Sequence, residues 1–143
     1  MQTVSVLIVD DVSAVRQDLR TALTLSGGIE VVGEAANGDD AIRQVAALHP
    51  QVALMDLEMP VMDGYEATRQ IKLQSPACRV IALTVHGYAE ARQKAMQSGV
   101  DSFFVKGMPI ETLVKRIMGQ RENGLELTRS DNEWGNCGRE AKN

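Results

Sequence analysis

Apolar and polar positions along the first 120 residues predict five short strands, each followed by an amphipathic helix. The expected strands are nearly continuous apolar runs, which is typical of parallel strands covered on both faces. They fall at residues 4–9, 29–32, 52–55, 80–83 and 102–105. Between these runs, apolar residues recur at helical spacing. The alternation predicts an α/β fold, a doubly wound parallel sheet with helices on both faces.

Glycine, proline and acidic residues set the expected helix limits. Gly27, followed by a second glycine, ends the first helix. Asp39 or Asp40 caps the second helix, which stops before Pro50 because the residue before proline is disfavoured in a helix. Pro109 suits the first turn of the fifth helix.

Composition narrows the class of protein without identifying it. The chain has 143 residues, 44% of them hydrophobic and 24% charged, which suits one domain over residues 1–121. Residues 122–143 hold few apolar side chains and are predicted to form a polar, flexible tail. The net charge of -4 weighs against nucleic-acid binding. With no signal-like or membrane-spanning segment visible, we expect a cytoplasmic protein that does not bind membranes.

Five polar residues come directly after expected strands and carry the candidate chemistry: Asp10, Asp11, Asp56, Thr84 and Lys106. Because the carboxyl ends of parallel strands share one edge of a sheet, these side chains should meet there. Clustered carboxylates raise the pKa of at least one member unless a cation joins them, and Mg²⁺ prefers such hard oxygen ligands. A carboxylate can also attack a phosphoryl group, whose charge an ammonium and a hydroxyl can offset. The pattern predicts a magnesium site with phosphate chemistry.

In this order and spacing, the motifs resemble the receiver domain of two-component response regulators over about residues 4–120. The matching residues are Asp10-Asp11, Asp56-x-x-Met59-Pro60-x-x-Asp63-Gly64, Thr84 and Lys106. The resemblance implies a flavodoxin-like fold with strand order 2-1-3-4-5. It also implies that Asp56 is the phosphoacceptor. A sensor histidine kinase or phosphotransfer protein would donate the phosphoryl group.

The resemblance assigns roles to the other residues of the site. Asp10 and Asp11 would be magnesium ligands, together with the main-chain carbonyl of Glu58. The downstream protein target is left open, as is a phosphorylation-dependent homodimer.

Two further residues would sense the phosphoryl group, and a third would relay its arrival. Thr84 and Lys106 are the sensing pair. Phe103 matches the aromatic switch position, with a plain core residue as the alternative. The output surface would be the fourth helix, fifth strand and fifth helix.

Two sequence features set this chain apart within the family it resembles. The family lysine is commonly followed by a cis proline, but Gly107 follows Lys106 here, and a trans peptide is expected because a cis bond before glycine is costly. Residues 31–38, together with 105–107, resemble the branch usually fused to a helix-turn-helix output domain. No such domain is visible in this sequence, so we expect no specific DNA binding by the chain itself.

Some residues near the site have two interpretations. Glu58 and His86 lie two positions after Asp56 and Thr84, and they either tune the access of water to the phosphoryl group or are solvated loop residues. Asp63 is expected to start a helix rather than bind metal. Cys78 is expected to be a small buried residue that forms no disulfide with the distant cysteine of the tail.

Three functions are compatible with these motifs. The first is a stand-alone interaction domain switched by phosphorylation. The second is the receiver fragment of a DNA-binding transcriptional regulator. The third is a magnesium-dependent phosphatase with an aspartyl nucleophile, for which Glu58 would be the second acid. Apart from autocatalysed phosphorylation and dephosphorylation of Asp56, enzymatic turnover is not expected.

Overall fold

The computed structural model describes residues 3–59, 62–85 and 89–119. The predictions for Pro60, His86 and residues 122–143 therefore lie outside the described residues. Within the described ranges, strands and helices alternate as follows: β1 (Val4–Val9), α1 (Ser13–Ser26), β2 (Ile29–Ala35), α2 (Gly38–Leu48), β3 (Val52–Asp56), α3 (Gly64–Gln74), β4 (Arg79–Thr84), α4 (Ala89–Ser98), β5 (Ser102–Val105) and α5 (Ile110–Ile117).

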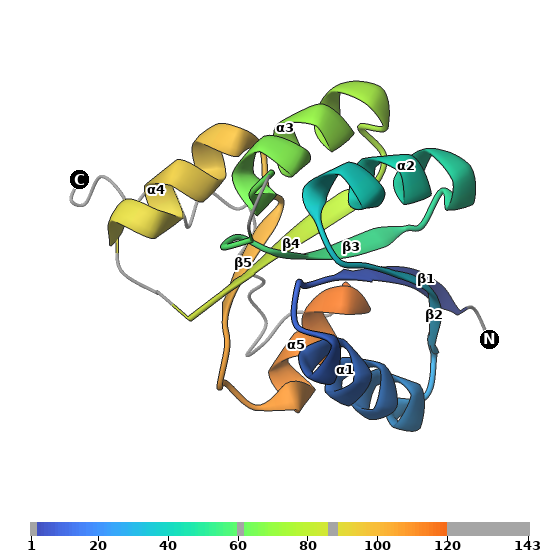
Figure 1. Cartoon of the computed structure of the whole chain (residues 1–143). Coiled ribbons are helices and arrows are strands. Elements are labelled where there is room, and N and C mark those ends of the chain that lie inside the picture. The colour runs from blue at the N-terminus through green and yellow to red at the C-terminus, as the bar shows by residue number, and fades with distance from the viewer. Residues whose placement is uncertain (1–2, 60–61, 86–88, 120–143) are drawn as a thin grey trace.

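The strands form one parallel sheet in the order β2-β1-β3-β4-β5, which confirms the predicted fold (Figure 1). Its register aligns the strand ends that carry the candidate site. Asp56 pairs with Leu83, and Thr84 pairs with Val105. The side chains of β1, β3, β4 and β5 that end these strands therefore reach the same edge of the sheet.

Helices cover both faces of the sheet, with α1 and α5 on one face and α2, α3 and α4 on the other (Figure 1). Because successive strand side chains point to opposite faces, each strand supplies both cores. Ile8 and Leu54 pack with the α1–α5 layer, whereas Leu7 and Met55 pack with the α2–α4 layer. All four of these side chains are fully buried, and burial of each contributes about 1.5–3 kcal/mol.

The second strand is longer than predicted and continues through Gly33 and Glu34 to Ala35. Glu34 is an unusual strand residue, but Arg16 and Arg20 of α1 bind its carboxylate at 3.0 and 2.6 Å. These contacts, the bond from Arg20 foremost, hold the pKa of Glu34 below its usual range. The arginines thus make a charged residue compatible with the strand.

The cap of α2 also differs from the prediction, because neither Asp39 nor Asp40 fills it. Asn37 is the capping residue, and its side chain accepts a hydrogen bond from the main-chain N–H of Asp40 at 2.9 Å. The two aspartates lie in the first helical turn, where their charges favour the helix dipole. Among the described residues, no helix has the length and apolar character needed to cross a membrane.

Candidate functional site

Three carboxylates gather at the carboxyl edge of the sheet. Asp10 and Asp11 follow β1, and Asp56 ends β3. One oxygen from each lies within 4.8 Å of the others. Asp10 and Asp56 are buried, at 1% and 3% exposure, while Asp11 is exposed. The structure therefore brings together the acidic residues that the sequence placed at strand ends.

Lys106 extends from the end of β5 into this acidic cluster. Its ammonium lies 3.1 Å from Asp10 Oδ2 and 3.5 Å from Asp56 Oδ1. Its main-chain N–H donates to the carbonyl of Thr84 at 2.7 Å, which joins the ends of β4 and β5. A lysine in this position partly balances the clustered negative charge.

The electrostatics of the cluster leave Asp56 hard to ionise. Burial, followed by the negative charge of Asp10, raises the pKa of Asp56 from an ordinary 3.8 to about 6, although Lys106 opposes the rise. The pKa of Lys106 is raised, although burial alone would lower it. Burial lowers it, but the bond to Asp10 and the charge of Asp56 outweigh that effect, so the pKa lies above its usual value. Both shifts favour a cation at this site.

Glu58 and Thr84 are joined by a contact that the sequence did not predict. The Thr84 hydroxyl donates to the Glu58 carboxylate, with Oγ1 lying 3.1 and 3.3 Å from its two oxygens. The Glu58 main-chain N–H donates to Asp56 Oδ1 at 3.2 Å. Thr84 is buried and Glu58 is exposed, so the contact joins the buried end of β4 to a residue at the surface.

Arg16 is a second contributor that the sequence analysis missed. Its guanidinium donates to the main-chain carbonyl of Asp10 at 2.6 Å and also binds Glu34. The bond fixes the backbone at the turn from β1 into α1. Its only sequence signal is a position in the first turn of the first helix, six residues after Asp10.

The loop between β3 and α3 returns close to the site. Asp63 caps α3 by accepting a hydrogen bond from the Glu66 N–H at 3.0 Å, as expected for a helix start. Gly64 donates its N–H to the Leu57 carbonyl at 3.2 Å and packs against the end of β3. On the other side of the site, Gly107 follows Lys106 in a trans peptide, since no cis bond occurs among the described residues, and its φ of 99° suits glycine.

Phe103 lies in β5, where it pairs with Ala82 of β4. Its ring is 6% exposed and belongs to the core beneath α2, α3 and α4. The guanidinium of Arg92 lies over the ring, 5.5 Å from its centroid. This geometry places the ring against Arg92 of α4. The switching role of Phe103 stays a prediction.

The donor set fits a hard divalent cation. Oxygens on opposite sides of a bound Mg²⁺ are about 4 Å apart, and the three carboxylate oxygens lie within 4.8 Å of one another, so small side-chain rotations let them share one ion with ordered waters. The charge chemistry agrees, because an added cation would offset both the burial of Asp56 and the repulsion from Asp10 that raise the pKa of Asp56. Asp10, Asp11 and Asp56 therefore form an acidic pocket suited to divalent metal.

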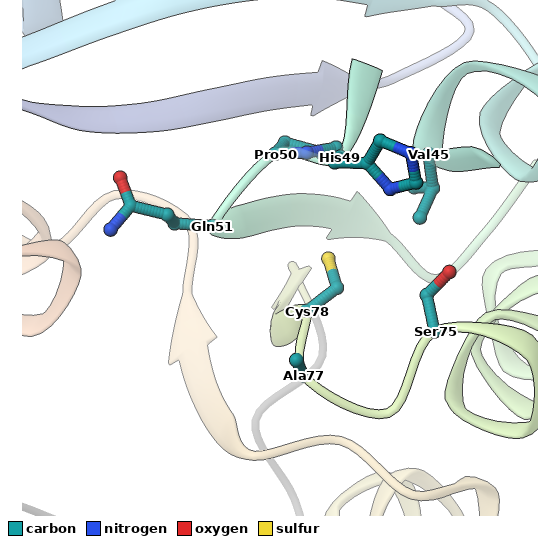
Figure 2. A pocket seen from close by; sticks show the side chains of 7 residues that line it. All are labelled: Val45, His49, Pro50, Gln51, Ser75, Ala77 and Cys78. Carbon is teal, nitrogen blue, oxygen red and sulfur yellow. The ribbon is translucent and has the colours of Figure 1, made fainter. Parts of the chain in front are cut away.

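A separate hollow of about 170 Å³ lies at the opposite edge of the sheet (Figure 2). Gln51 and Cys78 line it just before β3 and β4 begin. Burial raises the pKa of the Cys78 thiol to about 11, so the thiol stays protonated. As predicted, Cys78 is a buried residue. The hollow contains no residue of the acidic pocket.

The parallel sheet in the order 2-1-3-4-5, with an acidic pocket at its carboxyl edge, is a flavodoxin-like receiver fold. Comparison with known proteins identifies the family. Residues 6–118 match the response regulator receiver domain. The chain belongs to this family of two-component signalling proteins, whose members are typically signalling switches rather than enzymes. The resemblance found in the motifs is confirmed.

Individual relatives agree with this assignment. The transcriptional regulatory protein LnrK of Bacillus subtilis is 32% identical over 136 residues, which cover 92% of this chain and 62% of LnrK. The receiver domain of the putative response regulator NarL from Mycobacterium tuberculosis has a TM-score of 0.79 and 32% identity, covering 83% of this chain and 96% of that one. A chain of the CheX–CheY–BeF₃–Mg²⁺ complex from Borrelia burgdorferi has a TM-score of 0.75 and 26% identity, covering 82% of this chain and 89% of that one. The chain thus spans less than two thirds of LnrK.

Proposed function

We propose that this chain is a phosphorylation-dependent signalling switch in which Asp56 accepts a phosphoryl group in a Mg²⁺-dependent reaction. One observation carries the proposal: the buried carboxylate of Asp56 lies 3.5 Å from the Lys106 ammonium, inside a pocket of three carboxylates. A buried carboxylate is an unfavourable anion, so converting it to a metal-stabilised acyl phosphate changes the local charge balance sharply.

The proposed step needs only groups that the site supplies and a donor. An Asp56 carboxylate oxygen bonds to phosphorus, and the bond from phosphorus to the donor breaks with its electron pair leaving on the donor. The donor is the phosphohistidine of a sensor kinase or phosphotransfer protein. Bound Mg²⁺, held by Asp10, Asp11 and the main-chain carbonyl of Glu58, would neutralise phosphoryl oxygen charge. The Lys106 ammonium, already beside Asp10 and Asp56, would neutralise the charge on a further phosphoryl oxygen.

The signal would then pass from the site to the surface formed by α4, β5 and α5. Thr84 donates to the phosphoryl group, and Phe103 responds two residue pairs away along the β4–β5 register. Arg92 links the Phe103 ring to α4. A protein target, or a second copy of the chain, would recognise the altered surface. In the family such switches act in the cytoplasm, and we place this one there.

Water access to the acyl phosphate would set how long the signal lasts. Glu58 is exposed at the mouth of the site, which suits a role in controlling water access. We propose the same role for His86, which lies two positions after Thr84 in the sequence. Replacing both residues by alanine and timing phosphate loss tests this role, and unchanged decay would reject it.

A second candidate function is the receiver portion of a DNA-binding regulator. It is favoured by the match to LnrK, a transcriptional regulatory protein of which this chain spans 62%. In this version, residues 1–121 are the receiver and 122–143 lead toward an output domain. Reading the coding sequence past residue 143 tests it, because a helix-turn-helix segment in frame would support the regulator.

The phosphatase alternative requires catalytic turnover of a free substrate. Its second acid would be Glu58, but in the structure that carboxylate accepts the Thr84 hydroxyl. Incubating the protein with Mg²⁺ and a generic phosphate ester distinguishes the phosphatase from the signalling switch. The switch predicts no sustained release of alcohol, whereas continuous release would favour the enzyme.

Asp11→Asn is expected to weaken Mg²⁺ binding by at least about tenfold, because it replaces one anionic ligand. Even the loss of a residue that only hydrogen-bonds to a metal ligand lowers metal affinity by about tenfold or more. Because Asp11 is exposed, the fold should be retained. Calorimetric titration with Mg²⁺ measures the affinity. Asp18→Asn, on an exposed position of α1, removes the same charge away from the cluster and should leave affinity within about twofold. Equal affinities for Asp11→Asn and wild type would exclude Asp11 as a ligand.

A further inference from the structure

Glu58 contacts both the proposed phosphoacceptor and the proposed phosphate sensor. Its main-chain N–H donates to Asp56 Oδ1 at 3.2 Å. Its carboxylate oxygens lie 3.1 and 3.3 Å from Thr84 Oγ1. These contacts use different parts of the residue, so a side-chain substitution can remove the second without removing the first.

The donor in the Thr84 contact is fixed by chemistry. An ionised carboxylate can only accept hydrogen bonds, so the Thr84 hydroxyl must donate its hydrogen to Glu58. A hydroxyl has a single hydrogen to donate. The oxygens of a phosphoryl group on Asp56 would also be acceptors. The Glu58 carboxylate and the phosphoryl group therefore compete for the same hydrogen.

We infer that Glu58 is a positioning residue that holds the Thr84 hydroxyl in the unphosphorylated protein and thereby lowers the affinity of the site for a phosphoryl group. This inference rests on the proposed function. The Glu58 side chain is exposed, so water can replace Thr84 as its partner when the hydroxyl leaves. Its negative charge also repels an incoming anion, and the test must separate these two effects.

A double-mutant cycle separates them, with beryllofluoride and Mg²⁺ as the phosphoryl probe. Calorimetry measures probe affinity for wild type, Glu58→Ala, Thr84→Ala and the double variant. We expect Glu58→Ala to tighten binding about threefold to tenfold, the change for one typical net hydrogen bond, because water partly replaces the contact to Glu58. In the Thr84→Ala background the gain should fall by at least about threefold, because no hydroxyl remains to be released.

Two controls keep the result interpretable. Thr84→Ser keeps the hydroxyl at this fully buried position. It should therefore preserve the full effect of Glu58→Ala. Glu30→Gln removes a negative charge from an exposed position at the start of β2 and should leave probe affinity unchanged. Far-UV circular dichroism checks that each variant is folded.

The outcomes distinguish failure of the inference from failure of the proposed function. An equal gain in both Thr84 backgrounds would assign the effect to charge repulsion and overturn the inference. Unchanged affinity with a changed rate of phosphate loss would also overturn it, leaving Glu58 to control water access only. If wild type binds no probe, or Asp56→Asn binds it equally well, the proposed function itself fails.

Discussion

Asp56→Asn is expected to raise the free energy of unfolding of the metal-free protein by up to about 3 kcal/mol near pH 7. The carboxyl group is 3% exposed, and burial together with the charge of Asp10 raises its pKa from 3.8 to about 6. A difference of about two pKa units between folded and unfolded protein corresponds to about 3 kcal/mol. The neutral amide avoids the cost of ionising this buried group. Urea unfolding in the presence of a chelator measures the change.

The pH dependence of this effect has a definite sign. Because the folded pKa of Asp56 lies above the unfolded one, its stabilising contribution is complete below about pH 4 and is lost as the pH rises through about 6. The advantage of Asp56→Asn over wild type should therefore grow across that window. Asp18→Asn, at an exposed position, should show no such growth. A constant difference between Asp56→Asn and wild type from pH 4 to about 7 would contradict the proposed electrostatics.

Gly64→Ala is expected to destabilise the protein by about 3 kcal/mol or more, because the added methyl group would strike the main chain at the end of β3. A Cβ at this position would lie 2.8 Å from Leu57 Cα and closer still to the Asp56 carbonyl oxygen. Neither atom can move aside without shifting the strand that carries Asp56. Chemical unfolding reports the loss of stability, and Mg²⁺ titration reports whether the displaced carboxylate still binds metal.

Gly107→Ala is the matched control for this prediction. A Cβ at Gly107 meets no atom within 4 Å, so its cost comes from the φ of 99° alone. That cost is about 1–2 kcal/mol. If Gly64→Ala were no more destabilising than Gly107→Ala, the close approach of α3 to the end of β3 would not be a constraint on the site.

The sheet and the acidic pocket could be predicted because both follow from strand ends. Continuous apolar runs mark strands covered on both faces, and parallel pairing brings their last residues to one edge. Asp10, Asp11, Asp56 and Lys106 were therefore expected to meet, and the structure brings them together. Burial is the main cause of the raised pKa of Asp56, and the repulsion expected among clustered carboxylates adds to it through Asp10.

The features that the sequence did not predict depend on contacts between distant side chains. The second strand extends past the predicted residue 32 to Ala35, and Arg16 and Arg20 bind Glu34 in this added part. The contact between Glu58 and Thr84 joins residues 26 positions apart, one in the loop after β3 and the other at the end of β4. The period of apolar residues predicts which face of a strand or helix a residue occupies. Which polar side chains bind each other depends on the geometry of the loops, which the sequence pattern does not determine.

The central claim is that Asp56 accepts a phosphoryl group, and mass spectrometry after incubation with Mg²⁺ and a small phosphodonor tests it most directly. Wild type should gain one phosphoryl group per chain, peptide mapping should place it on Asp56, and a chelator should prevent it. Lys106→Met should reduce the yield, since it removes the ammonium 3.5 Å from Asp56. Asp56→Asn should gain none. No adduct on wild type, or an equal adduct on Asp56→Asn, would contradict the account.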